Sequence, residues 1–402
     1  MPRQVRPAVL VAYGAFVLLG ITAGTGGVLL PSQMATYGVS RATIGITFFA
    51  VSAGFVLAGL STGALVSRLG TRIALGAGCG VLVVSGLYLA TRPPFIAFVL
   101  AQVVLGYGAG ILESVLNVWL AAQPGATTLL NRLHAFWGVG ALLGPPLAAW
   151  IIGFASWMTV WLVLAAAFIP LLACFLVAFP RQLPEPAVPV PGAPGTPVAG
   201  PAGVLGAALR DRGVQLGAAM LTVYVGLELS VGNWGFSYLV QARTLPQSLA
   251  GYAVSGYWLG LTLGRFLISP VAARAGMTTG GMLYACLAGV TAAATLAWLS
   301  PTPVACVALG LLGFFLGPIF PTTMAITPRL TQARLVPTAI GVMNGASVAG
   351  GSALPWLAGT IAQGTGIWVL LPFALVLAFA QLAVWRPITS RLGPASAPGD
   401  PR

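Results

Sequence analysis

The sequence has little charge, and very little of that charge is acidic. Its 402 residues include five acidic side chains, one histidine and no lysine, so the 18 basic residues are all arginines. Charged residues make up 6% of the chain and hydrophobic residues 58%. So few charges cannot cover an apolar core with a water-facing surface. We therefore expect most of the surface to face lipid.

The scarcity of reactive side chains argues against several classes of protein. With one histidine and four scattered cysteines there is no metal-ligand spacing, and we expect no metal and no cofactor. An enzyme is not expected either, because no nucleophile and base are arranged together. Without lysine there is no glycine-rich lysine loop for a nucleotide. The cysteines are Cys79, Cys174, Cys286 and Cys306.

Apolar stretches long enough to cross a bilayer recur from end to end. A spanning helix needs roughly 20 apolar residues. The first stretch is too long for a signal-peptide core and lacks a small-residue cleavage site, so we expect it to be retained. The twelve predicted spans lie near 8–29, 42–66, 73–91, 95–121, 131–153, 157–179, 213–240, 248–271, 278–299, 303–326, 337–362 and 366–386.

The arginines fall almost entirely on one side of these spans. If the N-terminus is cytoplasmic, only Arg41, Arg92 and Arg243 lie outside and Arg265 lies within a span. This bias predicts a multi-pass inner-membrane protein with both termini in the cytoplasm, and it explains the net charge of +13 without a nucleic-acid partner. The cytoplasmic arginines are Arg3, Arg6, Arg68, Arg72, Arg132, Arg181, Arg210, Arg212, Arg274, Arg329, Arg334, Arg386, Arg391 and Arg402.

A proline-rich segment divides the chain into related halves. Residues 180–212 predict a flexible cytoplasmic linker between six-helix bundles at 1–179 and 213–387, and 388–402 predict a cytoplasmic tail. Short matches then follow in the same order in both halves. LLGIT around Gly20 matches YVGLE around Gly226, VSRLG ending at Gly70 matches VAARAG ending at Gly276, LGYGAG at 105–110 matches LGFFLG at 312–317, and Gly140 with Pro145 matches Gly350 with Pro355. The sequence thus predicts an all-α membrane protein of two pseudo-repeated bundles.

Only two acidic residues, Glu113 and Glu228, fall inside predicted spans. A charge at the bilayer centre costs about 2.5–3.5 kcal/mol on insertion scales, so an ionisable residue there is a functional candidate. Gly106, Gly110, Glu113 and Asn117 are spaced to share one helix face. Removal from water favours a neutral carboxyl, so Glu113 could exchange a proton as a solute moves. The structural alternative is a protonated Glu113 that hydrogen-bonds a neighbouring helix.

Glu228 begins a second polar cluster in the seventh predicted span. Tyr224 lies one turn earlier on the same face, and Gly232, Asn233 and Trp234 follow. A Gly-Asn pair could loosen the helix and free backbone groups for a solute, while the Trp ring offers an apolar plane to a sugar or other cyclic ligand. The alternative places Trp234 in the aromatic belt at the outer membrane interface.

Arg265 and His134 lie near the ends of predicted spans. Arg265 follows the stripe Gly256, Gly260 and Gly264. We expect it to snorkel or to pair with a helix terminus at the cytoplasmic gate, a mainly structural role. His134 opens the fifth predicted span and is either a gate residue, a titrating group or, more ordinarily, a structural side chain.

Several motifs resemble the major facilitator superfamily. GALVSRLGTR at 63–72 is similar to its loop signature, with Arg68 and Arg72 as the expected gate residues and Ser67 in place of the usual aspartate. Other segments resemble the fucose/galactose:proton symporter family and its bypass-of-stop-codon-like and sodium-dependent glucose transporter relatives. These segments are LESVLN at 112–117, LLNRLHAFWGVGALLGP at 129–145, YVGLELSVGNW at 224–234 and SGYWLGLTLGR at 255–265.

This resemblance implies the major facilitator fold and a monomer in lipid that carries a small sugar-like solute with a proton by alternating access. It also implies that Glu113 is the family's fourth-helix carboxylate and Asn117 its neighbouring amide. The symporters carry a first-helix aspartate where this chain has Gly27. Consequently Glu113 and Glu228 divide the work, or the coupling ion differs, or the chain is a uniporter.

Two other functions stay open at this point. The run from Gly140 to Pro145 resembles an antiporter signature of the fifth helix, which would fit efflux of drugs or metabolites. A non-transporting membrane sensor is the further alternative, although neither the short tails nor the linker suggest a signalling domain.

Overall fold

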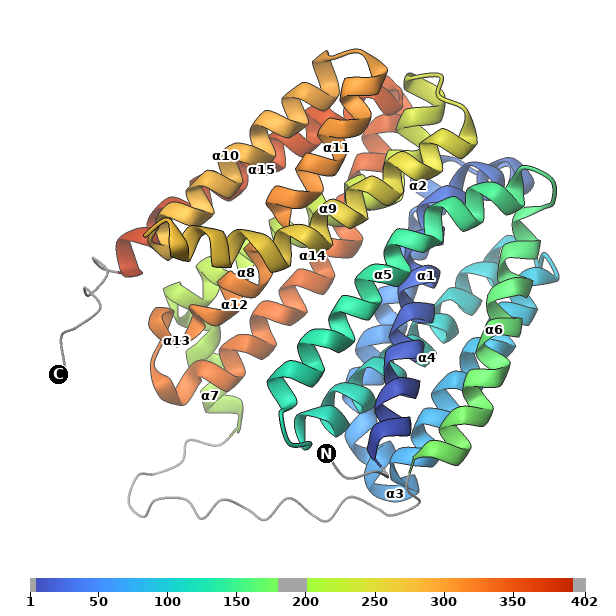
Figure 1. The fold of residues 1–402 in the computed structure, drawn as a ribbon, viewed down its shortest axis with the longest axis horizontal. Coiled ribbons are helices and arrows are strands. Elements are labelled where there is room, and N and C mark those ends of the chain that lie inside the picture. Colours follow the sequence, from blue (N-terminus) through green and yellow to red (C-terminus); the bar gives the residue numbers. More distant parts are fainter. Residues whose placement is uncertain (1–4, 180–200, 393–402) are drawn as a thin grey trace. The chain divides into compact units, whose positions relative to one another are not determined.

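The computed structural model describes residues 5–179 and 201–392, and every regular element in these ranges is a helix (Figure 1). Arg3, Arg181, Arg402 and residues 180–200 of the predicted linker lie outside the described residues. The α-helices are α1 (Val5–Tyr37), α2 (Arg41–Ile44), α3 (Ile46–Ala90), α4 (Phe95–Ala121), α5 (Ala126–Ile152), α6 (Trp157–Ala178), α7 (Pro201–Arg210), α8 (Arg212–Ser237), α9 (Gln247–Arg274), α10 (Thr279–Leu299), α11 (Thr302–Leu316), α12 (Ile319–Ala325), α13 (Thr327–Leu330), α14 (Val336–Thr365) and α15 (Leu370–Leu392). A π-helix, η1 (Tyr238–Ala242), follows α8, and the 3-10 turns η2 (Ala333–Leu335) and η3 (Ile367–Val369) flank α14.

The helix lengths account for the twelve predicted spans. Among the described residues, nine apolar helical stretches are long enough to cross a membrane. One of them, Arg41–Ala90, has 50 residues and bends at Gly70, so it supplies two spans. The helices α9 and α14, with 28 and 30 residues, are also long enough, since a span needs roughly 20. The all-α membrane fold predicted from the sequence is therefore confirmed.

Two segments expected to be irregular are helical. The predicted loop at 63–72 continues α3 and is interrupted only at Gly70, where φ is +79° and a residue without a side chain is favoured. In the predicted linker, residues 201–210 form α7, because the dense prolines end there and the following sequence is rich in alanine and leucine, which favour helix. The linker over the remaining residues stays a prediction.

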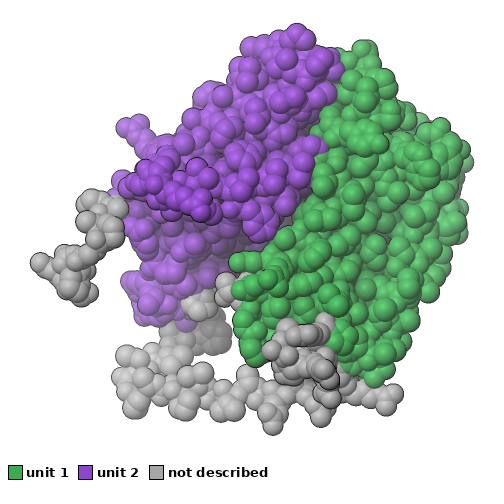
Figure 2. Space-filling model, viewed as in Figure 1, with its two compact units in different colours: residues 1–193, 239–255 green, residues 194–238, 256–402 purple. Residues whose placement is uncertain are grey.

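The described chain forms two compact units, coloured separately in Figure 2. Unit 1 comprises residues 1–193 and 239–255, and unit 2 comprises 194–238 and 256–402. Residues 239–255 join unit 1 because Arg41 donates to the Gln241 side chain at 2.8 Å, and Ser255 donates to a main-chain carbonyl of α5. The bundle boundaries predicted at 179 and 213 place residues 239–255 in the second bundle, whereas the structure groups them with unit 1.

The order of helix packing inside one unit recurs inside the other. In unit 1, α1 packs against α5 and α6, and α3 packs against α4 and α6. In unit 2, α8 packs against α14 and α15, and α10 packs against α11 and α15. Each of these contacts lies six spans after its counterpart. The predicted pseudo-repeat is therefore visible in the packing as well as in the sequence.

Glycines at matching positions make the closest helix contacts in both units. A Cβ on Gly106 of α4 would overlap the Val51 carbonyl of α3, and a Cβ on Gly313 of α11 would overlap the Tyr257 carbonyl of α9. Small residues allow backbones to approach in lipid, where the hydrophobic effect does not drive helices together. A further matching pair is Gly140 against Val17 and Gly350 against Thr222.

We predict that Gly260→Ala destabilises the fold whereas Gly256→Ala does not. A Cβ on Gly260 would overlap the backbone of Gly310 and Phe314 on α11, but a Cβ on Gly256 would meet nothing within 4 Å. Forced separation of packed helices costs about 1–3 kcal/mol. Thermal unfolding in detergent should therefore show a lower midpoint for Gly260→Ala alone. Equal midpoints for the two variants would show that α9 and α11 need no such close approach.

Candidate functional site

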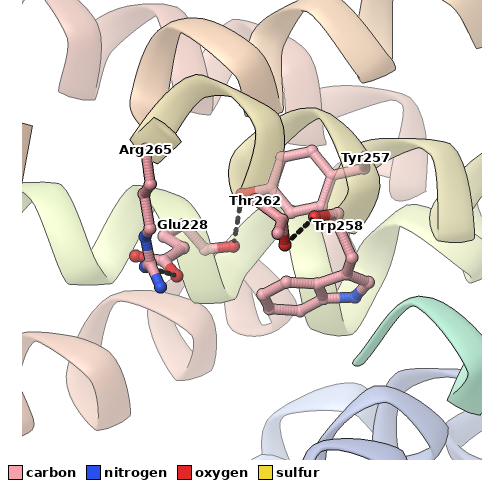
Figure 3. Close-up of polar contacts among 5 residues, drawn as sticks. All are labelled: Glu228, Tyr257, Trp258, Thr262 and Arg265. Carbon is pink, nitrogen blue, oxygen red and sulfur yellow. Dashed lines mark hydrogen bonds and ion pairs between the residues drawn. The ribbon is translucent and has the colours of Figure 1, made fainter. Parts of the chain in front are cut away.

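A partly buried ion pair joins α8 to α9 in unit 2. Arg265 Nη2 lies 3.4 Å from Glu228 Oε1, and the two side chains point toward each other in Figure 3. The exposed fraction is 9% for the Glu228 side chain and 31% for that of Arg265. Charge-assisted hydrogen bonds are usually about 2.7–2.9 Å long, so this is one long contact and not a closed two-pronged pair. Arg265 Nε is buried and has no hydrogen-bond partner in the described part of the chain.

Two tyrosines lie beside this ion pair. The Tyr257 hydroxyl on α9 donates to the main-chain carbonyl of Glu228 at 2.9 Å, which fixes α9 against α8 (Figure 3). Tyr224 lies one turn before Glu228, is fully buried, and interacts electrostatically with both Glu228 and Arg265. Its hydroxyl lies within hydrogen-bonding reach of both charged side chains, although neither contact has regular hydrogen-bond geometry in the described residues. The ion pair and Tyr224 therefore form one polar cluster.

The structure corrects the expectation for Arg265. It pairs with the carboxylate of Glu228 and not with a helix terminus. The reason is the close contact of α8 with α9, where the Trp258 ring lies against Gly232 and leaves no room for a Cβ. The prediction that Tyr224 and Glu228 share one face agrees with their common proximity to Arg265.

The expected break at Gly232 and Asn233 is not found, because both residues lie within α8 and the π-helix begins only at Tyr238. Asn233 is half-buried. Trp234 is fully buried, and its Nε1 donates to the Pro355 carbonyl on α14 at 2.8 Å. Its ring packs against Gly359, which has no side chain to compete for the space. In this structure Trp234 lies in the core of unit 2, neither in an outer belt nor as an open plane.

Unit 1 holds the second polar group. Glu113 is half-buried on α4, and its main-chain carbonyl accepts a hydrogen bond from Asn117 Nδ2 at 2.8 Å. Asn117 Oδ1 lies 3.2 Å from His134 Nε2 on α5, and the His134 ring meets Phe16 edge-on. His134 sits in the third turn of α5, because that helix begins at Ala126 and not at 131. The structure thus brings Glu113, Asn117 and His134 together across two helices.

Glu113 and Glu228 differ in their electrostatic partners. Within the described ranges no cation forms an ion pair with Glu113, whereas Glu228 has Arg265. The predicted gate residues Arg68 and Arg72 flank the bend of α3, one exposed and the other half-buried, and no ion pair involves them in those ranges. Their gating role stays a prediction.

Sequence reasoning missed Tyr257, Trp258 and Thr262. The Thr262 hydroxyl donates to the Trp258 carbonyl at 2.9 Å, inside α9. A usable signal existed, because Trp258, Thr262 and Arg265 are spaced four and three apart and so share a helix face. Polar side chains on one face of an apolar span indicate the side that faces protein and not lipid.

We predict that the two charges of the pair are coupled in stability. Arg265→Gln leaves Glu228 as an unpaired buried carboxylate, and breaking a fully buried pair costs about 3–5 kcal/mol. Because Arg265 is 31% exposed, we expect a smaller loss, roughly 1–3 kcal/mol. The double variant Glu228→Gln with Arg265→Gln should recover much of it, measured by thermal unfolding in detergent. If the stability losses of the two single variants simply add in the double variant, Glu228 and Arg265 do not interact directly.

Comparison with known proteins identifies the family. The model for the Major Facilitator Superfamily matches residues 11–243, more than half of the chain. Bypass of stop codon protein 6 of Saccharomyces cerevisiae is 26% identical over 384 residues, which cover 88% of this chain and 76% of that protein. The glucose/mannose transporter GlcP of Bacillus subtilis is 22% identical over 385 residues, covering 93% and 94%.

A solved structure shows the same fold. A variant of the E. coli fucose:proton symporter FucP superposes with a TM-score of 0.63 at 15% identity, and the match covers 97% of this chain and 99% of that one. The resemblance read from the motifs is therefore confirmed. With its repeated helical bundles and apolar spans, the chain belongs to the major facilitator superfamily and is a multi-pass membrane transporter of small molecules.

Proposed function

We propose that this transporter moves a small sugar-like solute together with a proton, and that Glu113 carries the coupling proton. The observation that carries the proposal is the contrast between the two intramembrane carboxyl groups. Glu228 has a cation beside it, while Glu113 has none in the described part of the chain. A carboxylate without a counter-charge is costly in lipid, so protonation relieves that cost at Glu113 more than at Glu228.

The neighbours of Glu113 support this assignment. Asn117 ties the next turn of α4 to His134 on α5, so the helix that carries Glu113 is held to its neighbour by polar contacts. An amide beside a carboxyl group also supplies both a donor and an acceptor, which suits the hydroxyl groups of a sugar. His134 is exposed and adds a titratable side chain near the same site.

The names of similar proteins point to the same class of solute. One is a glucose/mannose transporter and another is a fucose:proton symporter. We further propose that the chain resides in an inner membrane with both termini in the cytoplasm, on the arginine bias described above. Efflux of a drug or metabolite is the alternative, and the direction of transport in the experiment below distinguishes the two.

The test uses the purified protein in proteoliposomes with labelled glucose, mannose, fucose, galactose and glucuronate, with and without an inward proton gradient. We expect the gradient to drive accumulation of at least one of these sugars. Glu113→Gln should abolish that accumulation but keep exchange of labelled for unlabelled sugar, because the amide can still bind the solute but cannot take up a proton.

A matched control is Asp211→Asn, the same chemical change outside the proposed site. Asp211 caps α8 by accepting hydrogen bonds from Gly213 N and Val214 N at 2.8 and 3.1 Å. Asparagine is an equally good helix cap, so this variant should accumulate sugar as the unmodified protein does. If Glu113→Gln still concentrates sugar against its gradient, Glu113 is not the coupling group.

A further inference from the structure

Arg265 has more bonding capacity than its partner uses. Its guanidinium carries five N–H donors in a planar fork that matches a carboxylate with two parallel hydrogen bonds. Glu228 meets this fork through a single contact of 3.4 Å, and Nε is buried without a partner in the described residues. A buried N–H donor that forms no hydrogen bond costs free energy. The fork is therefore only partly occupied by the resident carboxylate.

Arg265 lies on a different side of α9 from the exposed apolar residues of that helix. Along α9, Leu259, Leu263 and Phe266 are exposed, as expected for a lipid-facing stripe. Arg265 lies on another face, which it shares with Trp258 and Leu261, both at least 96% buried. The 31% of its side chain that is exposed therefore lies away from that apolar stripe. An acidic group that reaches this face of α9 can approach the guanidinium.

We propose that Arg265 binds the carboxylate of an acidic sugar, and that Glu228 occupies the guanidinium only while the solute is absent. This inference rests on the proposed function, since it narrows the sugar-like solute to one that bears a carboxylate. The contact geometry carries it: a long, single-pronged ion pair beside an unused donor is the arrangement that a better-fitting carboxylate displaces. Tyr224 supplies a further donor, because its buried hydroxyl lies beside both charged side chains and makes no hydrogen bond of regular geometry in the described ranges.

Displacement of Glu228 from Arg265 by the solute determines how many protons the cluster takes up. Before binding, the cluster holds one positive charge on Arg265 and one negative charge on Glu228. When the solute carboxylate takes the guanidinium, Glu228 loses its counter-charge in a buried position. One proton from solution then adds to the Glu228 carboxylate and gives a neutral acid, so the cluster again holds one charge of each sign. Binding of one acidic sugar therefore takes up one proton at Glu228, while a neutral sugar takes up none there.

The experiment measures binding and proton uptake together. Glucuronate and, separately, glucose are added to the purified protein in weakly buffered detergent, and the change in pH is recorded against the amount bound. We expect the unmodified protein to take up about one proton more per glucuronate than Glu228→Gln does, by the balance above. Glu228→Gln should still bind glucuronate, because Arg265 remains and its competitor is gone.

Variants of Arg265 test the cation itself. The double variant Glu228→Gln with Arg265→Gln avoids an unpaired buried charge, and we expect glucuronate to bind to it roughly ten-fold or more weakly than to Glu228→Gln alone. Arg265→Lys keeps the charge without the planar fork and should bind glucuronate at an intermediate strength. The control is Arg274→Gln, which removes an exposed arginine at the end of the same helix and should change nothing.

The outcomes separate this inference from the function it rests on. If the neutral sugars are carried and glucuronate is neither bound nor carried, the sugar assignment stands and the role of Arg265 as a carboxylate site is wrong. If glucuronate binds with equal proton uptake in the unmodified protein and in Glu228→Gln, displacement of Glu228 is wrong. If no sugar of either kind binds or is carried, both proposals fail.

Discussion

In an apolar solvent an ionisable side chain is stable when it is paired with an opposite charge or when it is in its neutral form. This constraint decides where charged residues can lie in the molecule. The arginines lie mainly outside the predicted spans, and Arg265 is held inside one with Glu228 on the adjacent helix. Glu113 meets the same constraint without a cation in the described part of the chain. On the function proposed above, the two carboxyl groups have two different stable states, Glu228 ionised in a pair and Glu113 neutral. A difference of charge state is the basis for a difference of role.

The two halves share their frame but not their polar groups. The glycines that bring helices together recur at matching positions, as Gly106 with Gly313 shows. The same alignment of 105–110 with 312–317 places Phe320 opposite Glu113, and the alignment of Gly20 with Gly226 places Thr22 opposite Glu228. The packing glycines recur because the helices of each unit must approach one another closely. Substrate and ion binding need no such symmetry, which agrees with the proposal that Glu113 and Glu228, where the halves diverge, are the functional side chains.

The sequence alone was sufficient for most of the fold, because span length and apolar composition depend on local chemistry. The span at 95–121 matches α4, and nine helical stretches of the described chain are long and apolar enough to cross a membrane. The loop predicted between the second and third spans is instead a sharp kink at Gly70, because one glycine with positive φ is enough to turn the chain between two helices. The partner of Arg265 was missed for another reason. The partner depends on which helices touch. Neither residue spacing nor composition shows that α9 packs against α8, where Tyr257 contacts Glu228.

Trp234 shows why a motif can suggest the wrong role. An aromatic ring after a Gly-Asn pair reads as a ligand platform when the helix is assumed to loosen there. In the folded chain α8 remains intact at that point, and the ring fills the space above Gly359 while its Nε1 bonds to the Pro355 carbonyl. The hydrogen bond from Trp234 to the Pro355 carbonyl ties α8 to α14. The side chain that suggested solute binding is thus used in packing against a neighbouring helix. The α8–α9 contact around Glu228 and Arg265 is one place in unit 2 where buried polar atoms have no hydrogen-bond partner in the described residues.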